Sequence, residues 1–256
     1  MDLLCREHDL TLDFTPIDTG DMPEFDFDDT LDGLIAKGWT GVTITHPHKN
    51  KARARAADGM ISVVAHLPAS NLLTFHPEIR GFNTDYTGFI GAWRTEMGNA
   101  IPGQVAVAGA GGVAGAIVPA LVELGATDIA VWDQARGVAA RLAEAVDGPV
   151  RAISMSDAPA VISDADGLVN ASALGMGDDR RSAFPIETIG SQAWAFDAVY
   201  TPTRTTFLRA AASRGLTTIS GFDLFRHMIL GSFEAYSGVR PNKDKMLPLI
   251  DALRPD

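Results

Sequence analysis

A glycine-rich turn follows an apolar run near the middle of the chain. The run VAVAGAGGVAGA passes from small and β-branched residues through Gly109, Ala110, Gly111, Gly112, Val113 and Ala114 into a helical pattern. In a G-x-G-x-x-G/A turn the first glycine permits the tight turn, the second lets a ligand approach the backbone, and the last small residue packs helix on sheet. Unpaired N–H groups at the helix start attract phosphate. The spacing predicts a dinucleotide-binding turn, and the alternative is a glycine turn in an unrelated α/β protein.

An acidic residue ends the next apolar run. Asp133 closes TDIAVWD, about as far from the glycine turn as the carboxylate that meets the adenosine ribose in such folds. A carboxylate accepts hydrogen bonds from both ribose hydroxyls and repels a 2′-phosphate, so NAD is favoured over NADP. Arg136 weakens this preference, because its guanidinium could reach a 2′-phosphate. The alternative role of Asp133 is a helix N-cap.

Two modules of alternating strands and helices are expected to position these residues. In the first, the pattern predicts strands over 10–17, 41–45 and 69–74, and helices over 30–37, from near Pro47 and after Thr84. From Gln104 the alternation becomes regular, with strands at the glycine turn, at Asp133 and near residues 150, 168, 194 and 217. We therefore predict an α/β fold in which an N-terminal α/β domain accompanies a doubly wound parallel-sheet Rossmann domain.

The expected domain bounds follow from this rhythm. Residues 1–98 form a substrate and catalytic domain, which helices within 222–256 complete, and residues 99–221 form the dinucleotide-binding Rossmann domain.

Several segments resemble the shikimate/quinate dehydrogenase family, in the order and spacing of that family over about residues 40–230. GVTITHPHK at 41–49 resembles the strand that ends at Pro-x-Lys, and GFNTDYTG at 81–88 matches the Gly-x-Asn-Thr-Asp segment. LVNASALGM at 168–176 and FDAVYTPTRTTFLRAA at 196–211 resemble two segments of the cofactor domain. The Thr-His-Pro form of the first segment, together with Asp133, is similar to the NAD-using quinate/shikimate branch.

The resemblance implies hydride transfer between a nicotinamide and a ring hydroxyl of a hydroxylated cyclohexane or cyclohexene carboxylate, such as shikimate to 3-dehydroshikimate. As the hydride leaves carbon, a proton must leave the hydroxyl oxygen, so a base must touch that hydroxyl. Lys49 and Asp85 match the family's proton-transfer pair. Taken without the resemblance, they would be a solvated surface lysine and a helix cap.

The resemblance also assigns binding residues. Those expected to bind substrate are Thr43, Thr45, Asn71, Tyr200 and Met228. Those expected to bind cofactor, besides the glycine turn and Asp133, are Asn170, Ser172, Ala198 and Gly221. His46 and His48 flank Pro47 without further residues at metal-ligand spacing, so no metal site is expected.

The chain departs from the family at the substrate pocket. The family's Ser-x-Ser-Pro segment, whose serines hold the substrate carboxylate, has no match, so an upstream portion is expected to be either lost or unnecessary. Thr43 stands in place of an asparagine and Met228 in place of a glutamine. Missing partners weaken recognition of hydroxyls, so shikimate itself is the doubtful substrate rather than the reaction class.

Two other functions compete with this interpretation. The first is a degenerate cofactor-binding or sensor protein of the same fold, and retention of both Lys49 and Asp85 argues against it. The second is another two-domain dehydrogenase, of the methylene-tetrahydrofolate type, which fits the architecture but not the segment at 81–88.

The composition narrows the classes of partner. A formal net charge of −11 over 256 residues would repel a phosphate backbone, so we expect no nucleic-acid partner. Cys5 is the single cysteine, and we identify neither a signal peptide nor a bilayer-spanning apolar run. We expect a cytoplasmic monomer or homodimer, without a membrane partner, that binds a small polyhydroxylated ring acid.

Overall fold

The computed structural model describes residues 1–20, 22 and 24–255 as an α/β protein. The chain divides into two compact units. The first unit comprises Met1–Thr84 and Ile229–Ile250, and the second comprises Asp85–Met228 and Asp251–Asp256. The helix that follows Thr84 is thus grouped with the second unit, whereas the expected boundary lies near residue 98.

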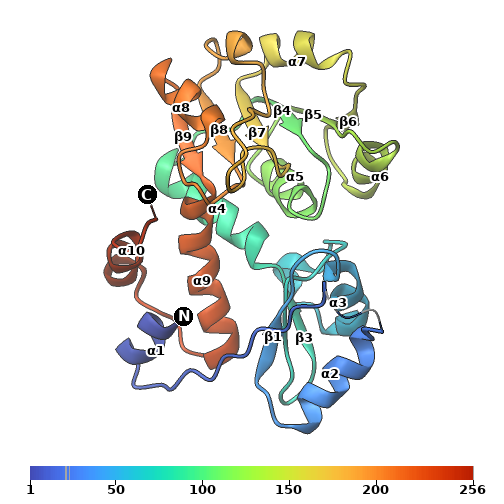
Figure 1. Ribbon diagram of the computed structural model, residues 1–256, viewed down its shortest axis with the longest axis vertical. Coiled ribbons are helices and arrows are strands. Elements are labelled where there is room, and N and C mark those ends of the chain that lie inside the picture. The colour runs from blue at the N-terminus through green and yellow to red at the C-terminus, as the bar shows by residue number, and fades with distance from the viewer. Residues whose placement is uncertain (21, 23, 256) are drawn as a thin grey trace. The chain divides into compact units, whose positions relative to one another are not determined.

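A six-stranded parallel sheet forms the centre of the second unit (Figure 1). Its strands are β4 (Gln104–Ala108), β5 (Asp128–Trp132), β6 (Val150–Ala152), β7 (Gly167–Asn170), β8 (Trp194–Asp197) and β9 (Thr217–Ser220). They lie in the order β6-β5-β4-β7-β8-β9, and every neighbouring pair is parallel. The chain therefore winds outward from β4 in both directions, which confirms the predicted doubly wound sheet and places a topological switch point between β4 and β7.

Helices bury the two faces of this sheet. On one face, α7 (Ala158–Asp164) and α8 (Thr206–Ser213) pack on a core that includes Ala106, Leu168 and Ala195. On the other face, α4 (Thr84–Glu96) places Phe89 on Phe196, with ring centroids 4.9 Å apart. Trp93 of the same helix meets Trp194 edge-on at 4.7 Å. These aromatic contacts explain why α4 belongs to the second unit. The second unit also contains the helices α5 (Ala114–Glu123) and α6 (Val138–Ala145).

The first unit contains a small antiparallel sheet in the order β1-β2-β3. Its strands are β1 (Gly41–Thr43), β2 (Leu72–Thr74) and β3 (Arg80–Phe82), and its helices are α1 (Asp2–Glu7), α2 (Phe27–Ala36), α3 (Lys49–Ala56) and α10 (Lys243–Asp251). The helix α9 (Gly221–Ser237) begins in the second unit and ends in the first. Three short 3₁₀ helices span Ala57–Gly59, Ser62–Val64 and Ile186–Thr188.

One predicted strand of the first unit is wrong. Residues 10–17 form no strand and are exposed, although Leu10, Leu12 and Phe14 alternate with polar residues as a strand would. An extended segment becomes a strand only when a neighbouring strand satisfies its backbone groups, and among the described residues the backbone bond recorded for this segment is a local one, from the N–H of Leu10 to the carbonyl of Cys5. The pattern also failed to identify β3, whose three residues are too few to show periodicity.

No helix among the described residues is long and apolar enough to cross a bilayer.

Candidate active site

The glycine turn has the geometry that its sequence predicts. Gly109 has a φ of +95°, and a Cβ there would lie 2.8 Å from the backbone atoms of Ala171 and Ser172 in the loop after β7. Both the conformation and the close approach therefore require glycine. At Gly111 an added Cβ would meet open space, so a ligand can approach the backbone there. Ala114 is fully buried at the start of α5, where a larger side chain would separate helix from sheet.

Backbone donors of this turn are available to a ligand. Among the residues that the structure describes, the N–H groups of Gly111, Gly112 and Val113 have no hydrogen-bond partner. They precede the N-terminus of α5, where the helix dipole favours negative charge. The turn can therefore hold an anionic group such as a pyrophosphate.

Asp133 links the glycine turn to the loop after β5. Its Oδ2 accepts a hydrogen bond from the N–H of Ala110, and its Oδ1 accepts one from the N–H of Ala135, both at 2.8 Å. The residue at the N-cap of α6 is Gly137, so Asp133 does not cap this helix. The carboxylate is held beside the turn, half-buried, and each oxygen keeps further acceptor capacity.

Asn170 holds the loop that follows β7. Its Nδ2 donates to the carbonyl of Leu174 at 3.0 Å and to Oδ1 of Asp197 at 2.9 Å. Its Oδ1 accepts from both the N–H and the hydroxyl of Ser172. All its side-chain bonding capacity is directed within the protein, so Asn170 shapes the loop that Gly109 approaches.

Asp197 is a buried carboxyl at the end of β8, beside Asn170 in the sheet. Besides Asn170, it accepts hydrogen bonds from the Val199 N–H at 3.0 Å and from the Thr205 hydroxyl at 2.6 Å. Burial nevertheless dominates and raises the pKa of Asp197 from 3.8 to about 6, while the hydrogen bonds act in the opposite direction. The sequence showed Asp197 within a family segment but did not identify it as a site residue.

Replacing Asp197 with asparagine should change how stability depends on pH. The folded state favours the protonated acid. The contribution of this carboxyl to the free energy of unfolding is therefore most favourable below pH 3.8. It falls as the pH rises from 3.8 through about 6, by about 3 kcal/mol in all. The Asp197→Asn variant resembles the protonated form. Its free energy of unfolding should therefore increase relative to that of the native chain as the pH rises from 4 to about 7. Urea unfolding across this range measures the difference. A difference that does not vary with pH would contradict the assignment, and Asp147→Asn, at an exposed position, controls for the loss of a surface charge.

The two predicted catalytic residues each open a helix. Lys49 is the first residue of α3 and is half-buried, and its carbonyl accepts a hydrogen bond from the N–H of Ser70 at 3.0 Å. Asp85 lies in the first turn of α4 and is buried, with 7% of its surface exposed. Lys49 belongs to the first unit and Asp85 to the second.

Asn71, the residue before β2, fixes the start of α4. Its Oδ1 accepts from the backbone N–H of Thr84 at 2.8 Å, and its Nδ2 donates to the Thr84 hydroxyl at 3.0 Å. Ser232 of α9 also bonds to that hydroxyl, at 3.2 Å. Asn71 is only 2% exposed, and these bonds make it a cap for the helix that carries Asp85.

The other polar residues predicted to bind substrate in this unit lie at the end of β1. The Thr43 hydroxyl is 2.8 Å from the hydroxyl of Tyr236, whose pKa burial raises to about 12 despite the opposing hydrogen bond from Thr43. Thr45 is exposed, and its carbonyl accepts from the N–H of His48. The two threonines thus present short hydroxyl side chains just before Lys49.

The predicted residues of the second unit lie after β8 and along α9. Tyr200 is 59% exposed and stacks on Phe225, with ring centroids 6.5 Å apart. An added Cβ at Gly221 would lie 2.5 Å from the carbonyl oxygen of Ala198, so the first turn of α9 lies directly against the chain after β8. Met228 lies two turns further along α9 and is half-buried.

No group of three or more histidine, cysteine, aspartate or glutamate side chains within residues 1–20, 22 and 24–255 is arranged to hold a metal ion.

Comparison with known proteins was made by sequence and by structure. No protein-family model matches the chain. A shikimate dehydrogenase (NADP(+)) of Methylobacterium radiotolerans is 34% identical over 227 residues, covering 86% of this chain and 80% of the relative. A quinate/shikimate dehydrogenase (NAD(+)) of Corynebacterium glutamicum is 32% identical over 223 residues, covering 84% of this chain and 78% of the relative.

Solved structures agree with these relatives. Quinate dehydrogenase from Corynebacterium glutamicum in complex with NAD has a TM-score of 0.89 and 27% identity, covering 98% of this chain and 92% of that one. Shikimate 5-dehydrogenase from Thermus thermophilus in complex with NADP(H) and shikimate has a TM-score of 0.79 and 27% identity, covering 97% and 91%. The chain therefore belongs to the shikimate/quinate dehydrogenase family of NAD(P)-dependent oxidoreductases.

Proposed function

We propose that this protein is an NAD-preferring dehydrogenase that oxidises a ring hydroxyl of a polyhydroxylated cyclohexane or cyclohexene carboxylate. The observation that carries the cofactor half of this proposal is the row of three unpartnered N–H groups at the glycine turn. The relatives carry the substrate half, because each is a quinate or shikimate dehydrogenase by name. A binding protein without turnover is not favoured, since these relatives are enzymes.

The residues present fit a nicotinamide dinucleotide. The pyrophosphate would meet the N–H groups of Gly111, Gly112 and Val113, and the adenosine ribose would meet Asp133 on the β5 side. The other half would then cross the ends of β7, β8 and β9, toward Ala198 and the start of α9. When bound, the nicotinamide accepts a hydride.

The protein itself must move a proton and orient the alcohol. We assign the proton to the pair Lys49 and Asp85, with the lysine Nζ and the aspartate carboxyl as the exchanging groups. Asp85 is buried, and Asn71 caps the helix on which it stands. Thr43 and Thr45 would bind hydroxyls of the ring, and Tyr200 is a further residue that we assign to the substrate. Asn170 and Ser172 would contribute by shaping the loop beside the glycine turn.

NAD(H) should bind at least about tenfold more tightly than NADP(H), or by roughly 1.4 kcal/mol. The carboxylate of Asp133, held in place by two backbone N–H groups, accepts from ribose hydroxyls and repels a 2′-phosphate. Fluorescence titration with NADH and NADPH measures both affinities. The variant Asp133→Asn should reduce the ratio of the NADPH to the NADH dissociation constant. The variant Arg136→Ala tests whether the exposed guanidinium of Arg136 assists binding of a 2′-phosphate. Equal affinities, or tighter NADPH binding, would overturn this preference.

The activity is tested by following NADH formation with shikimate, quinate and related ring acids at high concentration. Turnover with at least one of them is expected, and tight dinucleotide binding without turnover on any would favour the sensor alternative. The predicted domain bounds, a cytoplasmic location and a monomer or homodimer without nucleic-acid or membrane partners stay predictions.

A further inference from the structure

The first turn of α9 forms part of the edge at which β8 and β9 end. Ser220 is the last residue of β9, and Gly221 begins α9 against the carbonyl oxygen of Ala198. Ligands of open α/β sheets bind at the carboxyl ends of the strands. A displacement of this turn would therefore move the backbone surface that Ala198 and Gly221 offer to a dinucleotide.

A capping box defines this turn. The N–H and the hydroxyl of Ser220 donate to Oδ2 of Asp223, at 2.8 and 2.6 Å, and the N–H of Asp223 donates back to the Ser220 hydroxyl at 3.3 Å. The spacing Ser-x-x-Asp of a capping box is present in the sequence at residues 220–223. The capping box fixes where β9 ends and α9 begins.

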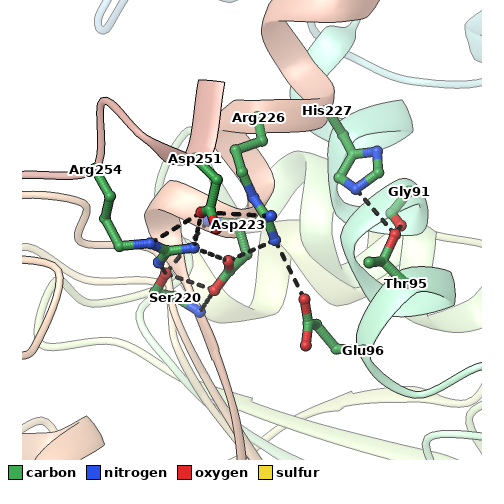
Figure 2. Close-up of polar contacts among 9 residues, drawn as sticks. All are labelled: Gly91, Thr95, Glu96, Ser220, Asp223, Arg226, His227, Asp251 and Arg254. Atoms are coloured by element: carbon green, nitrogen blue, oxygen red, sulfur yellow. Dashed lines mark hydrogen bonds and ion pairs between the residues drawn. The ribbon is translucent and has the colours of Figure 1, made fainter. Parts of the chain in front are cut away.

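A residue near the C-terminus binds to this capping box from outside (Figure 2). Arg254 donates from Nη2 to Oδ1 of Asp223 at 2.7 Å and from Nη1 to the Ser220 hydroxyl at 3.2 Å. Its guanidinium carbon lies 4.7 Å from the ring centre of Phe222. We call residues 220–223 the β9–α9 corner. Arg254 thus contacts three of its four residues, Ser220, Phe222 and Asp223.

The C-terminal segment is also attached to the chain after β8. The carbonyl of Pro255 accepts a hydrogen bond from the Thr203 hydroxyl at 3.1 Å, and Thr203 lies in the loop after Tyr200. Asp251 accepts from Arg254 at 2.7 Å, which orients the guanidinium. Residues 251–255 therefore connect the loop after β8 to the start of α9.

Other charges fix the same corner to α4. Arg226 pairs with Asp223 at 2.8 Å and with Glu96 at 3.2 Å, and only 10% of its side chain is exposed (Figure 2). Burial alone would raise the pKa of Asp223, but the hydrogen bonds from Arg254 and Ser220 outweigh it and lower that pKa. The Arg226 guanidinium is paired with carboxylates of the protein, so it is not available to bind a substrate carboxylate.

We propose that Arg254 is a positioning residue for the nicotinamide half of the dinucleotide, acting through the Ser220–Asp223 capping box at the β9–α9 corner. The inference rests on the proposed function, because it takes the dinucleotide to run from the glycine turn across the ends of β7, β8 and β9. Arg254 does not act on the adenosine half, since that half lies on the opposite side of β4 in the sheet order.

The test compares two probes on the full chain. ADP-ribose occupies only the adenosine and pyrophosphate half of the site, whereas NADH occupies the whole site. In Arg254→Ala we expect the dissociation constant for NADH to rise about tenfold while that for ADP-ribose stays within about twofold. The KM for NAD should rise with it, while the KM for the ring acid changes little. Arg254→Lys, which keeps the charge but not the planar fork, should recover part of the NADH affinity.

Controls separate positioning from stability. Arg240→Ala removes an exposed arginine that pairs with Glu234 outside the corner, and it should change neither affinity. Urea unfolding identifies any variant that has lost its fold. If Arg254→Ala is unfolded, Asp251→Asn is used in its place, because it weakens the bond that orients Arg254 and keeps the arginine itself. Equal weakening of both probes in a folded variant, or no weakening of NADH, would overturn the inference. Failure of the native chain to bind either probe would instead contradict the proposed function.

Discussion

Replacing Lys49 with alanine should lower kcat at least about a hundredfold while leaving the affinity for NADH nearly unchanged, and Asp85→Ala should do the same. Both residues are assigned to the proton that leaves the substrate hydroxyl, and general acid–base groups contribute roughly a hundredfold or more. The dinucleotide residues lie elsewhere, at the glycine turn and Asp133. Single-turnover and steady-state rates with the best available ring acid measure the first effect, and NADH titration measures the second.

The local structure supplies controls for these variants. Lys51→Ala changes an exposed lysine in the same helix and should keep near-normal turnover. The hydrogen bond that the Lys49 carbonyl accepts from Ser70 is a backbone contact and survives the substitution. Asp85→Asn keeps the shape of a buried side chain and distinguishes loss of charge from loss of packing. Near-normal turnover in Lys49→Ala or in Asp85→Ala would show that the catalytic assignment of that residue is wrong.

The sequence predicted the cofactor unit better than the substrate unit, for a physical reason. The four central strands β4, β5, β7 and β8 are almost entirely buried, so each appears as a largely apolar run between helices of distinct period. In the first unit the three strands have three residues each; β1 and β2 lie within predicted strands, whereas β3 was not identified. The segment around Phe14 has the alternation of a strand, but pairing between strands is a tertiary property that alternation cannot supply.

The site shows the same division between local and long-range information. Gly109 and Asp133 could be assigned because their roles depend on neighbours a fixed number of residues away. The bonds that join Asn170 to Asp197, 27 residues on, and Ser220 to Arg254, 34 residues on, depend on the packed sheet. Two features that were not assigned had a signal in the sequence: Asp197 lies in the segment at 196–211 that resembles the family, and Ser220 and Asp223 have the spacing of a capping box.

Shikimate should be a poor substrate of the chain of residues 1–256, with a raised KM as its main defect. No Ser-x-Ser-Pro segment occurs in these residues, and Thr43 and Met228 replace two amides that the family resemblance places at the substrate. In the family the two serine hydroxyls donate charge-assisted hydrogen bonds to the substrate carboxylate, and each such bond is worth on the order of 1.5 to 3 kcal/mol. The loss of both therefore weakens substrate binding by roughly two to four orders of magnitude. Initial rates over a wide range of shikimate and quinate concentrations measure KM and kcat separately.

Restoring one amide at a time tests the cause. Met228→Gln should lower the KM for shikimate by about tenfold with little change in kcat, because a regained hydrogen bond acts equally on bound substrate and transition state. Thr43→Asn should gain less, since it also breaks the contact between the Thr43 and Tyr236 hydroxyls. Met155→Gln makes the same change at an exposed methionine and should have no effect. If the unaltered chain already has a low KM for shikimate, or if Met228→Gln raises it, then other side chains hold the substrate and the resemblance misplaces this pocket.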